Sequence, residues 1–351
     1  RSKNGSTPFF SFHWGFDEDE RVWGQFWNHS LAALATFMSN WGSQFNCDLT
    51  HSRSTLLLKR LLARVRPREQ FFLSCYPVAD FDVGIYHPDL DWQTVHSRPN
   101  FYLRASGSQA TTMGQLGFKP VGTGWLGGPE FQVYNALNSS GYVARFITEE
   151  EIPRCRAIVV PYVETMPETA AARLRDFVAA GGLLVTMPVL ATHNGYGRPY
   201  PVCPGGGLNE VIGVTLEPAI IGQRSLVTLG TNPVIPWHFL QRAGSEPCYL
   251  WTFGHQRVPQ MSPDTQVVVK LYDGEPAITV HSFGKGKAIH LNMFTFEPFD
   301  PYEFSSFQAE SLRELFDNLL QWHGLKPFLT VEWPLLYGQA VDHWTLYQYR
   351  L

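Results

Sequence analysis

The residues best suited to chemistry lie near the start of the chain. An aromatic run ends in His13-Trp14 and is followed by the acidic stretch Asp17-Glu18-Asp19-Glu20. An indole ring stacks on the apolar face of a sugar, and carboxylates accept hydrogen bonds from its hydroxyls. The alternative is that the aromatic residues belong to a core and the acids to a solvated loop; we accept it for Phe9, Phe10 and Phe12. The candidate substrate-binding residues are His13, Trp14, Asp17 and Glu20.

A second place for chemistry is the turn after a predicted strand at Leu183–Thr186. Class I amidotransferases are built on a parallel sheet with helices on both faces, the architecture that we predict below for the middle of this chain. In these enzymes a nucleophilic Cys occupies such a turn. Here the turn reads Met187-Pro188-Val189 and holds no Cys, Ser or Thr. His290 and Glu297 could stand in for the remaining partners, but without a nucleophile we interpret them as a strand histidine and a surface carboxylate. We therefore predict no catalytic residue in this chain.

Cofactor and metal motifs are weak or missing. No GxGxxG opens a helix after a strand, and there is no P-loop. Gly205-Gly206-Gly207 precedes a short predicted helix and could hold an anion, although a turn that needs positive φ angles is the simpler interpretation. His87 with Asp89 and Asp91 could suggest a metal, but one loop seldom completes a site. We predict no cofactor and no metal.

Composition excludes several classes of protein. The 351 residues include 27 Lys or Arg against 31 Asp or Glu, a net charge of −4, so we expect no nucleic-acid partner. No apolar run approaches the length of a membrane span, and we expect no membrane association. The five Cys form no CxxC pair and their odd number argues against a complete disulfide framework. The compartment is left open.

The elements that must position these residues begin with a strand at 8–14. Apolar spacings of three and four over Leu31–Phe45 predict a helix, and a second helix is predicted at 53–65. From about residue 80, strands and helices alternate. This alternation predicts a parallel sheet with helices on both faces. The predicted strands of this part are 82–86, 143–147, 157–161 and 183–186, the helices are 129–140 and 167–180, and 104–128 is a long loop.

The last third of the chain changes character. Strands at 266–272, 277–281 and 287–291 are joined by Asp273-Gly274 and Gly284-Lys285-Gly286, which are typical hairpin turns. A long helix is predicted over 304–323, and the sequence from Thr330 looks like β structure that is still running at Leu351. Together with a start at Arg1 that has no Met, this leads us to expect a piece of a longer chain.

Several segments, in order, resemble the C-terminal part of glycoside hydrolase family 42, the β-galactosidases. The resemblance rests on residues 134–141, 156–161, 174–186, 204–214, 272–277 and 284–287. It implies a flavodoxin-like or class I amidotransferase-like parallel sheet at 78–325 that serves trimerisation. It also implies that 1–77 are the end of a TIM barrel, including its last strand, and that 326–351 start a small β domain.

The resemblance further implies a function for the longer chain. Family members hydrolyse terminal β-galactosides by a retaining mechanism that uses two Glu on earlier barrel strands. This chain lacks both, so its own catalytic status stays open. We expect carbohydrate and further copies of itself, as a homotrimer, to be its partners. The alternative is a non-catalytic carbohydrate-binding or structural assembly protein with a degenerate amidotransferase-like domain.

Overall fold

The computed structural model describes the following parts of the chain. They are residues 10–14, 37–41, 50, 56, 59, 60, 63, 66–68, 76, 77, 81–88, 133, 134, 136–138, 140–218, 220, 221, 225–230, 232–237, 248–252, 254–295, 306–328, 349 and 350. The chain divides into two compact units, Arg1–Asp80 with His343–Leu351, and Phe81–Asp342. Each unit is described by itself.

The described residues of the first unit form two pairs of short strands. β1 (Phe10–Trp14) runs parallel to β2 (Phe37–Trp41), and β3 (Tyr76–Pro77) pairs antiparallel with β17 (Tyr349–Arg350). The described residues Leu56, Lys59, Arg60 and Ala63 are helical, as the helix predicted at 53–65 requires, and the 3-10 turn η2 (Arg66–Arg68) contains Pro67.

The prediction of a helix over Leu31–Phe45 is wrong at Phe37–Trp41, where the structure has β2. The five residues Phe37-Met38-Ser39-Asn40-Trp41 show no alternation of apolar and polar side chains, and their apolar members have the spacing of a helix. Pairing with β1 in register decides for the strand. The strand predicted at 8–14 is confirmed as β1.

The second unit is built on a seven-stranded sheet with the order β14-β15-β16-β7-β6-β4-β5. Its strands are β4 (Val83–Tyr86), β5 (Ala144–Ile147), β6 (Ala157–Val160), β7 (Leu183–Thr186), β14 (Gln266–Lys270), β15 (Pro276–Phe283) and β16 (Gly286–Leu291). The five strands from β5 to β16 are parallel, and β15 and β14 extend the sheet as an antiparallel hairpin. The mixed α/β sheet confirms the predicted alternation of strands and helices.

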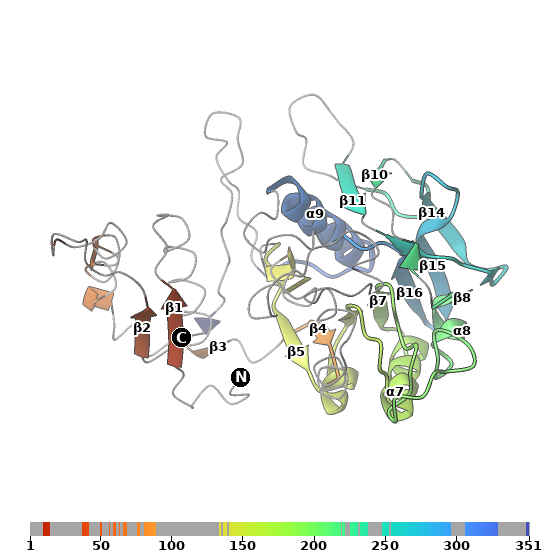
Figure 1. The fold of residues 1–351 in the computed structure, drawn as a ribbon, viewed down its shortest axis with the longest axis horizontal. Coiled ribbons are helices and arrows are strands. Elements are labelled where there is room, and N and C mark those ends of the chain that lie inside the picture. The colour runs from red at the N-terminus through yellow and green to blue at the C-terminus, as the bar shows by residue number, and fades with distance from the viewer. Residues whose placement is uncertain are drawn as a thin grey trace. The chain divides into compact units, whose positions relative to one another are not determined.

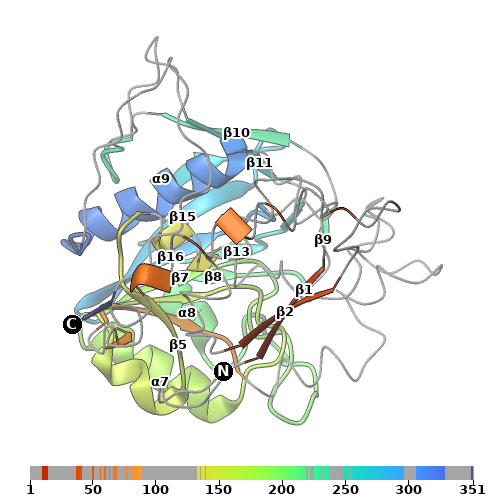
Figure 2. The same ribbon diagram turned by 90° about the vertical axis from the view of Figure 1, so that its left-hand side faces the viewer.

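Helices cover both faces of this sheet. α7 (Glu168–Ala179) and α9 (Ser306–Trp322) lie on opposite sides of it in Figures 1 and 2, and the short α8 (Leu208–Ile212) packs on the α7 side. The helical residues among 133–138 pack on the α9 side. Successive strand residues alternate between the two cores, because strand side chains alternate between faces. Ile158 faces the α7 core and Val159 the α9 core.

Short turns join the elements at the amino-terminal edge of the sheet. α7 ends before Gly181-Gly182, as predicted, and Gly181 has φ of 121°. The β15–β16 hairpin turns at Gly284, whose φ is 59° and whose Cα lies too close to the Ala179 backbone for any side chain. Lys285 N donates to Ala179 O at 3.0 Å, so the hairpin caps the end of α7.

The remaining elements of the second unit are short. They are η4 (Glu149–Arg154), β8 (Val214–Thr215), β9 (Ile220–Ile221), β10 (Ser225–Leu229), β11 (Cys248–Thr252), β12 (His255–Gln256) and β13 (Gln260–Met261). None of the helices in the described part of the chain has the length and apolar character needed to cross a membrane. The predicted 104–128 loop lies outside the described residues.

Candidate functional site

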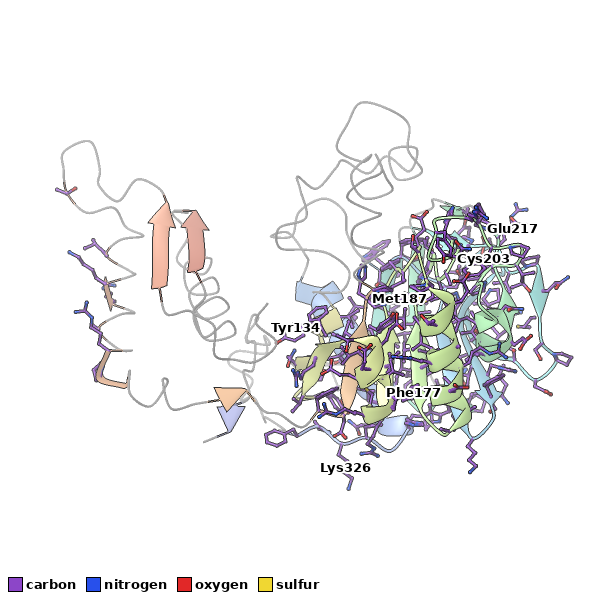
Figure 3. The ribbon with its side chains drawn as sticks, turned by 90° about the horizontal axis from the view of Figure 1, so that it is seen from below. Tyr134, Phe177, Met187, Cys203, Glu217 and Lys326 are labelled. Atoms are coloured by element: carbon purple, nitrogen blue, oxygen red, sulfur yellow. The ribbon has the colours of Figure 1, made fainter. Side chains whose placement is uncertain are left out.

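Backbone strain gathers where the parallel strands end. Tyr162, just after β6, has φ of 40°, and Val189 and Ala191, after β7, have φ of 67° and 47°. Such angles cost a non-glycine residue about 1–2 kcal/mol and persist only where the surroundings hold them. Doubly wound sheets also bind ligands at their carboxyl edge. This edge is therefore the candidate site of the second unit. Figure 3 shows Met187, Cys203 and Glu217 toward this side and Phe177 and Lys326 toward the other.

A buried amide network fixes the strained turn. The Val189 N–H donates to Oε1 of Gln256 at 2.6 Å, and Nε2 of Gln256 donates to Glu217 O at 2.7 Å. The Gln256 backbone exchanges two hydrogen bonds with the Asn292 side chain, at 2.9 and 2.7 Å. Asn292 Nδ2 also donates to Pro276 O at 3.0 Å. Gln256 thus joins the turn after β7 to β16 and β15.

This arrangement leaves the turn unable to perform acyl transfer. The residue with the strained conformation is Val189, whose side chain is only 6% exposed and offers no nucleophile. Its backbone N–H, a donor of the kind that stabilises an oxyanion, is already bonded to Gln256. The turn after β7 therefore offers neither a nucleophile nor a free oxyanion donor at Val189.

His290 is a core residue, as the strand interpretation predicted. It lies on β16 with no exposed surface, and its Nδ1 is 3.0 Å from Oγ1 of Thr186 on β7. Burial lowers the pKa of His290 to about 3, so the ring is neutral. Nε2 has no hydrogen-bond partner among the described residues. Glu297, its suggested companion, lies outside them.

The carboxyl edge also carries a histidine–carboxylate pair that no motif had indicated. Nδ1 of His193 lies 3.1 Å from Oε1 of Glu164, and both side chains are about one-fifth exposed. Oγ1 of Thr192 approaches the same Nδ1 at 2.9 Å. A hydrolase triad needs the base to use both ring nitrogens, one for each partner. In the described part of the chain both contacts of His193 fall on Nδ1, and the pair ties the loops after β6 and β7 together.

The glycine run at 205–207 is a turn. Gly206 and Gly207 have φ of 63° and 75°, and Gly207 is the N-cap of the five-residue α8. The simpler interpretation is thereby confirmed. His87 follows β4, while Asp89 and Asp91 lie outside the described residues. Within the described ranges, no group of three or more His, Cys, Asp or Glu could hold a metal ion.

The predicted sugar-site residues are only partly described. His13 and Trp14 are the last two residues of β1, and Asp17 and Glu20 lie outside the described residues. In the parallel pair, His13 is in register with Asn40 and Trp14 with Trp41. Asn40 and Trp41 thus reach the same strand ends and were missed because a helix was predicted there. The local sequence carries no period-two pattern that could have revealed them, because the strand is evident only from its pairing with β1.

Comparison with known proteins identifies the larger unit. The family model described as the beta-galactosidase trimerisation domain matches residues 131–326. The chain belongs to this family. The trimerisation domain therefore spans the sheet from β5 onward together with α7, α8 and α9, and the resemblance drawn from the sequence is confirmed. No curated protein matches the chain.

Solved structures extend the likeness in fold beyond the trimerisation domain. A beta-galactosidase from Bacillus circulans sp. alkalophilus gives a TM-score of 0.58 at 17% identity. The match covers 89% of this chain and 42% of the Bacillus protein. Gan42B, a GH42 beta-galactosidase from G. stearothermophilus, gives a TM-score of 0.54 at 16% identity. The match covers 86% of this chain and 38% of Gan42B. A beta-galactosidase from Halorubrum lacusprofundi gives a TM-score of 0.52 at 15% identity. The match covers 86% of this chain and 41% of the Halorubrum protein. The chain spans less than half the length of these proteins.

Proposed function

We propose that this chain is part of a β-galactosidase-like glycoside hydrolase and contributes its assembly and one wall of its sugar site. The observation that carries the proposal is the family match over 131–326. The complete gene product would hydrolyse terminal β-galactosides with retention, using carboxylates outside this chain. A chromogenic β-galactoside tests this. Absence of turnover by the complete gene product would favour the non-catalytic alternative.

The assembly role concerns the second unit. The family is described as a trimerisation domain, and we propose that copies of this chain associate as a homotrimer. Light scattering on the purified chain at micromolar concentration should give three times the monomer mass. A monomer at that concentration would contradict the assembly role.

The fold of the second unit supports an amidotransferase-like origin without amidotransferase activity. The order β5-β4-β6-β7-β16 is that of a flavodoxin-like doubly wound sheet. We propose that the amidotransferase-like domain covers 78–325, that 1–77 end a barrel and that 326–351 begin a β domain. The elbow after β7 carries Val189 and cannot supply a nucleophile.

The sugar-site wall concerns β1. In barrels of alternating strands and helices, the active site forms at the carboxyl ends of parallel strands. β1 has a parallel partner and ends in His13-Trp14. We propose that His13, Trp14, Asp17 and Glu20 belong to the sugar site, and that Trp14 turns toward the sugar at the exit of the strand, where the alternation of side chains ends.

Replacing Trp14 tests this wall. In the complete gene product, Trp14→Ala should weaken binding of galactose by about 1–3 kcal/mol, the value of an aromatic stacking contact, and leave the melting temperature nearly unchanged. Phe12→Ala, two residues earlier on the strand and assigned to the core, is the control and should lower the melting temperature instead. A large drop in melting temperature for Trp14→Ala with unchanged affinity would assign Trp14 to the core.

A further inference from the structure

The loop at residues 192–202, called the 192–202 loop below, is rigidly built. Oδ1 of Asn194 accepts hydrogen bonds from the backbone N–H groups of Tyr196 and Arg198 at 3.0 and 3.1 Å. Asn194 N donates to Arg198 O at 2.8 Å, which closes the hairpin. His193 forms β-bridges to both Thr165 and Pro199. The loop is therefore fixed at its tip and at its base.

This rigid loop presents apolar side chains to solvent. Tyr196 at the tip is 86% exposed, the highest value among the large hydrophobic residues that the structure describes. Val202 is 45% exposed, and Pro199 and Pro201 are exposed beside it. A fixed backbone and a side chain with two torsions lose little entropy on binding, which suits an aromatic anchor.

Several polar groups of the loop are used within the unit, whereas Arg198 is exposed near Tyr196. Asn194 caps the turn, His193 pairs with Glu164, and the Tyr200 hydroxyl donates to Met166 O at 3.0 Å. A small polar ligand or a sugar would need several convergent donors and acceptors. What the loop offers outward is mainly apolar, and this suits the surface of another protein.

In the described part of the unit, helices already cover both faces of the sheet. α7 and α8 pack on one face of the sheet, and α9 with the helical residues among 133–138 packs on the other. At the outer strand β14, Asn232 Nδ2 donates to Val268 O at 2.7 Å. A chain of a trimerisation family must nevertheless present an apolar contact to its copies.

We propose that the 192–202 loop is a contact through which copies of this chain associate, with Tyr196 as its anchor. The proposal rests on the proposed self-association and adds the surface that performs it. The carboxyl edge, which lacks a nucleophile at the elbow, serves in this chain as an interface. Truncating an anchor residue at the centre of an interface weakens association by about thirtyfold or more.

Light scattering across a dilution series tests the proposal on the complete 351-residue chain. The double variant Tyr196→Ser, Val202→Ser should shift the midpoint of dissociation at least about thirtyfold toward higher concentration. The matched control is Phe328→Ser. Phe328 is 66% exposed, and its N–H donates to Gly141 O near the opposite edge of the sheet. The control should dissociate like the wild type.

The outcomes separate the two proposals. A monomeric wild type would overturn both the assembly role and this contact. A trimeric wild type with an unshifted double variant, or with a shift in Phe328→Ser alone, would overturn the contact and leave the assembly role standing. Because all three side chains are exposed, we expect equal melting temperatures for the diluted monomers. A double variant that melts much earlier would show an internal role for the loop and also overturn the contact.

Discussion

His290 combines an ionisable side chain with a place in the middle of a packed sheet. Its ring is fully buried between strands, with Thr186 as the neighbour of Nδ1. Burial lowers the pKa from the ordinary 6.5 to about 3, since a charged ring would lose its hydration. Between about pH 3 and pH 6.5, the His290 side chain is therefore protonated in the unfolded chain and neutral in the folded chain. The stability that depends on neutral His290 is complete above about pH 6.5 and falls as the pH drops toward 3.

We predict that His290→Gln flattens the dependence of stability on pH. Between about pH 7 and about pH 5, titration of His290 should remove about 2 kcal/mol from the free energy of unfolding of the wild type, and the variant should be spared this loss. Urea unfolding at both pH values measures the difference. Thr186→Val is the control, because it removes the hydroxyl and keeps the titrating ring. Equal losses in wild type and His290→Gln would contradict the prediction.

At the same scale, the sequence was informative where a residue's role depends on its near neighbours. The missing nucleophile at Met187-Pro188-Val189 and the strand position of His290 could be read directly. The pair of His193 and Glu164 could not, because their approach depends on two loops that meet only after the sheet forms. Asp17 and Glu20 lie outside the described residues, and their sugar-binding role stays a prediction.

Helices and strands whose apolar residues recur at a clear period were predicted well. The α7 helix shows buried residues at Ala170, Leu174, Phe177 and Val178, as its spacing required, and the β15–β16 hairpin turns at its glycines. β2 was missed because its apolar residues have the spacing of a helix and its partner β1 is distant in sequence. The links made by Gln256 were not predicted either, since its partner Val189 is 67 residues away.

Gln256 should matter to the elements that it joins. We predict that Gln256→Ala lowers the free energy of unfolding by about 2–4 kcal/mol, because it leaves the Val189 N–H and the Glu217 carbonyl unpaired in a buried place. Denaturant unfolding followed by circular dichroism measures this. The control Gln260→Ala removes an exposed amide from β13 and should change stability by less than about 0.5 kcal/mol. Similar losses in both variants would show that the network carries no stability.

The whole molecule combines a unit built on a seven-stranded sheet with a smaller unit. The larger unit has two separate cores and a family assignment, and the smaller one contributes the parallel pair of β1 and β2. The resemblance to family 42 was drawn from six segments that occur in order along the sequence. The contact between copies could not be predicted from sequence, since exposure of Tyr196 becomes known only with the fold.

We predict that the purified 351-residue chain hydrolyses neither a chromogenic β-galactoside nor glutamine. The resemblance places the hydrolytic carboxylates on earlier barrel strands, and the elbow carries Val189. Release of nitrophenol and of ammonia are the measurements, with the complete gene product as the positive control for the first. Turnover above a buffer blank would contradict the prediction.

The two edges of the large sheet differ in how freely they can change. At the amino-terminal edge, α7 reaches β7 through residues 180–182, and the hairpin turn of β15 and β16 packs against the end of α7. At the carboxyl edge, the chain runs through 161–167 after β6 and through 187–207 after β7 before the next helix begins. Insertions at the first edge would separate a helix from its cap, whereas those at the second would lengthen the loop after β7, where Tyr196, Arg198 and Val202 are exposed. New specificities in such a domain can therefore arise at one edge while the other keeps the architecture unchanged.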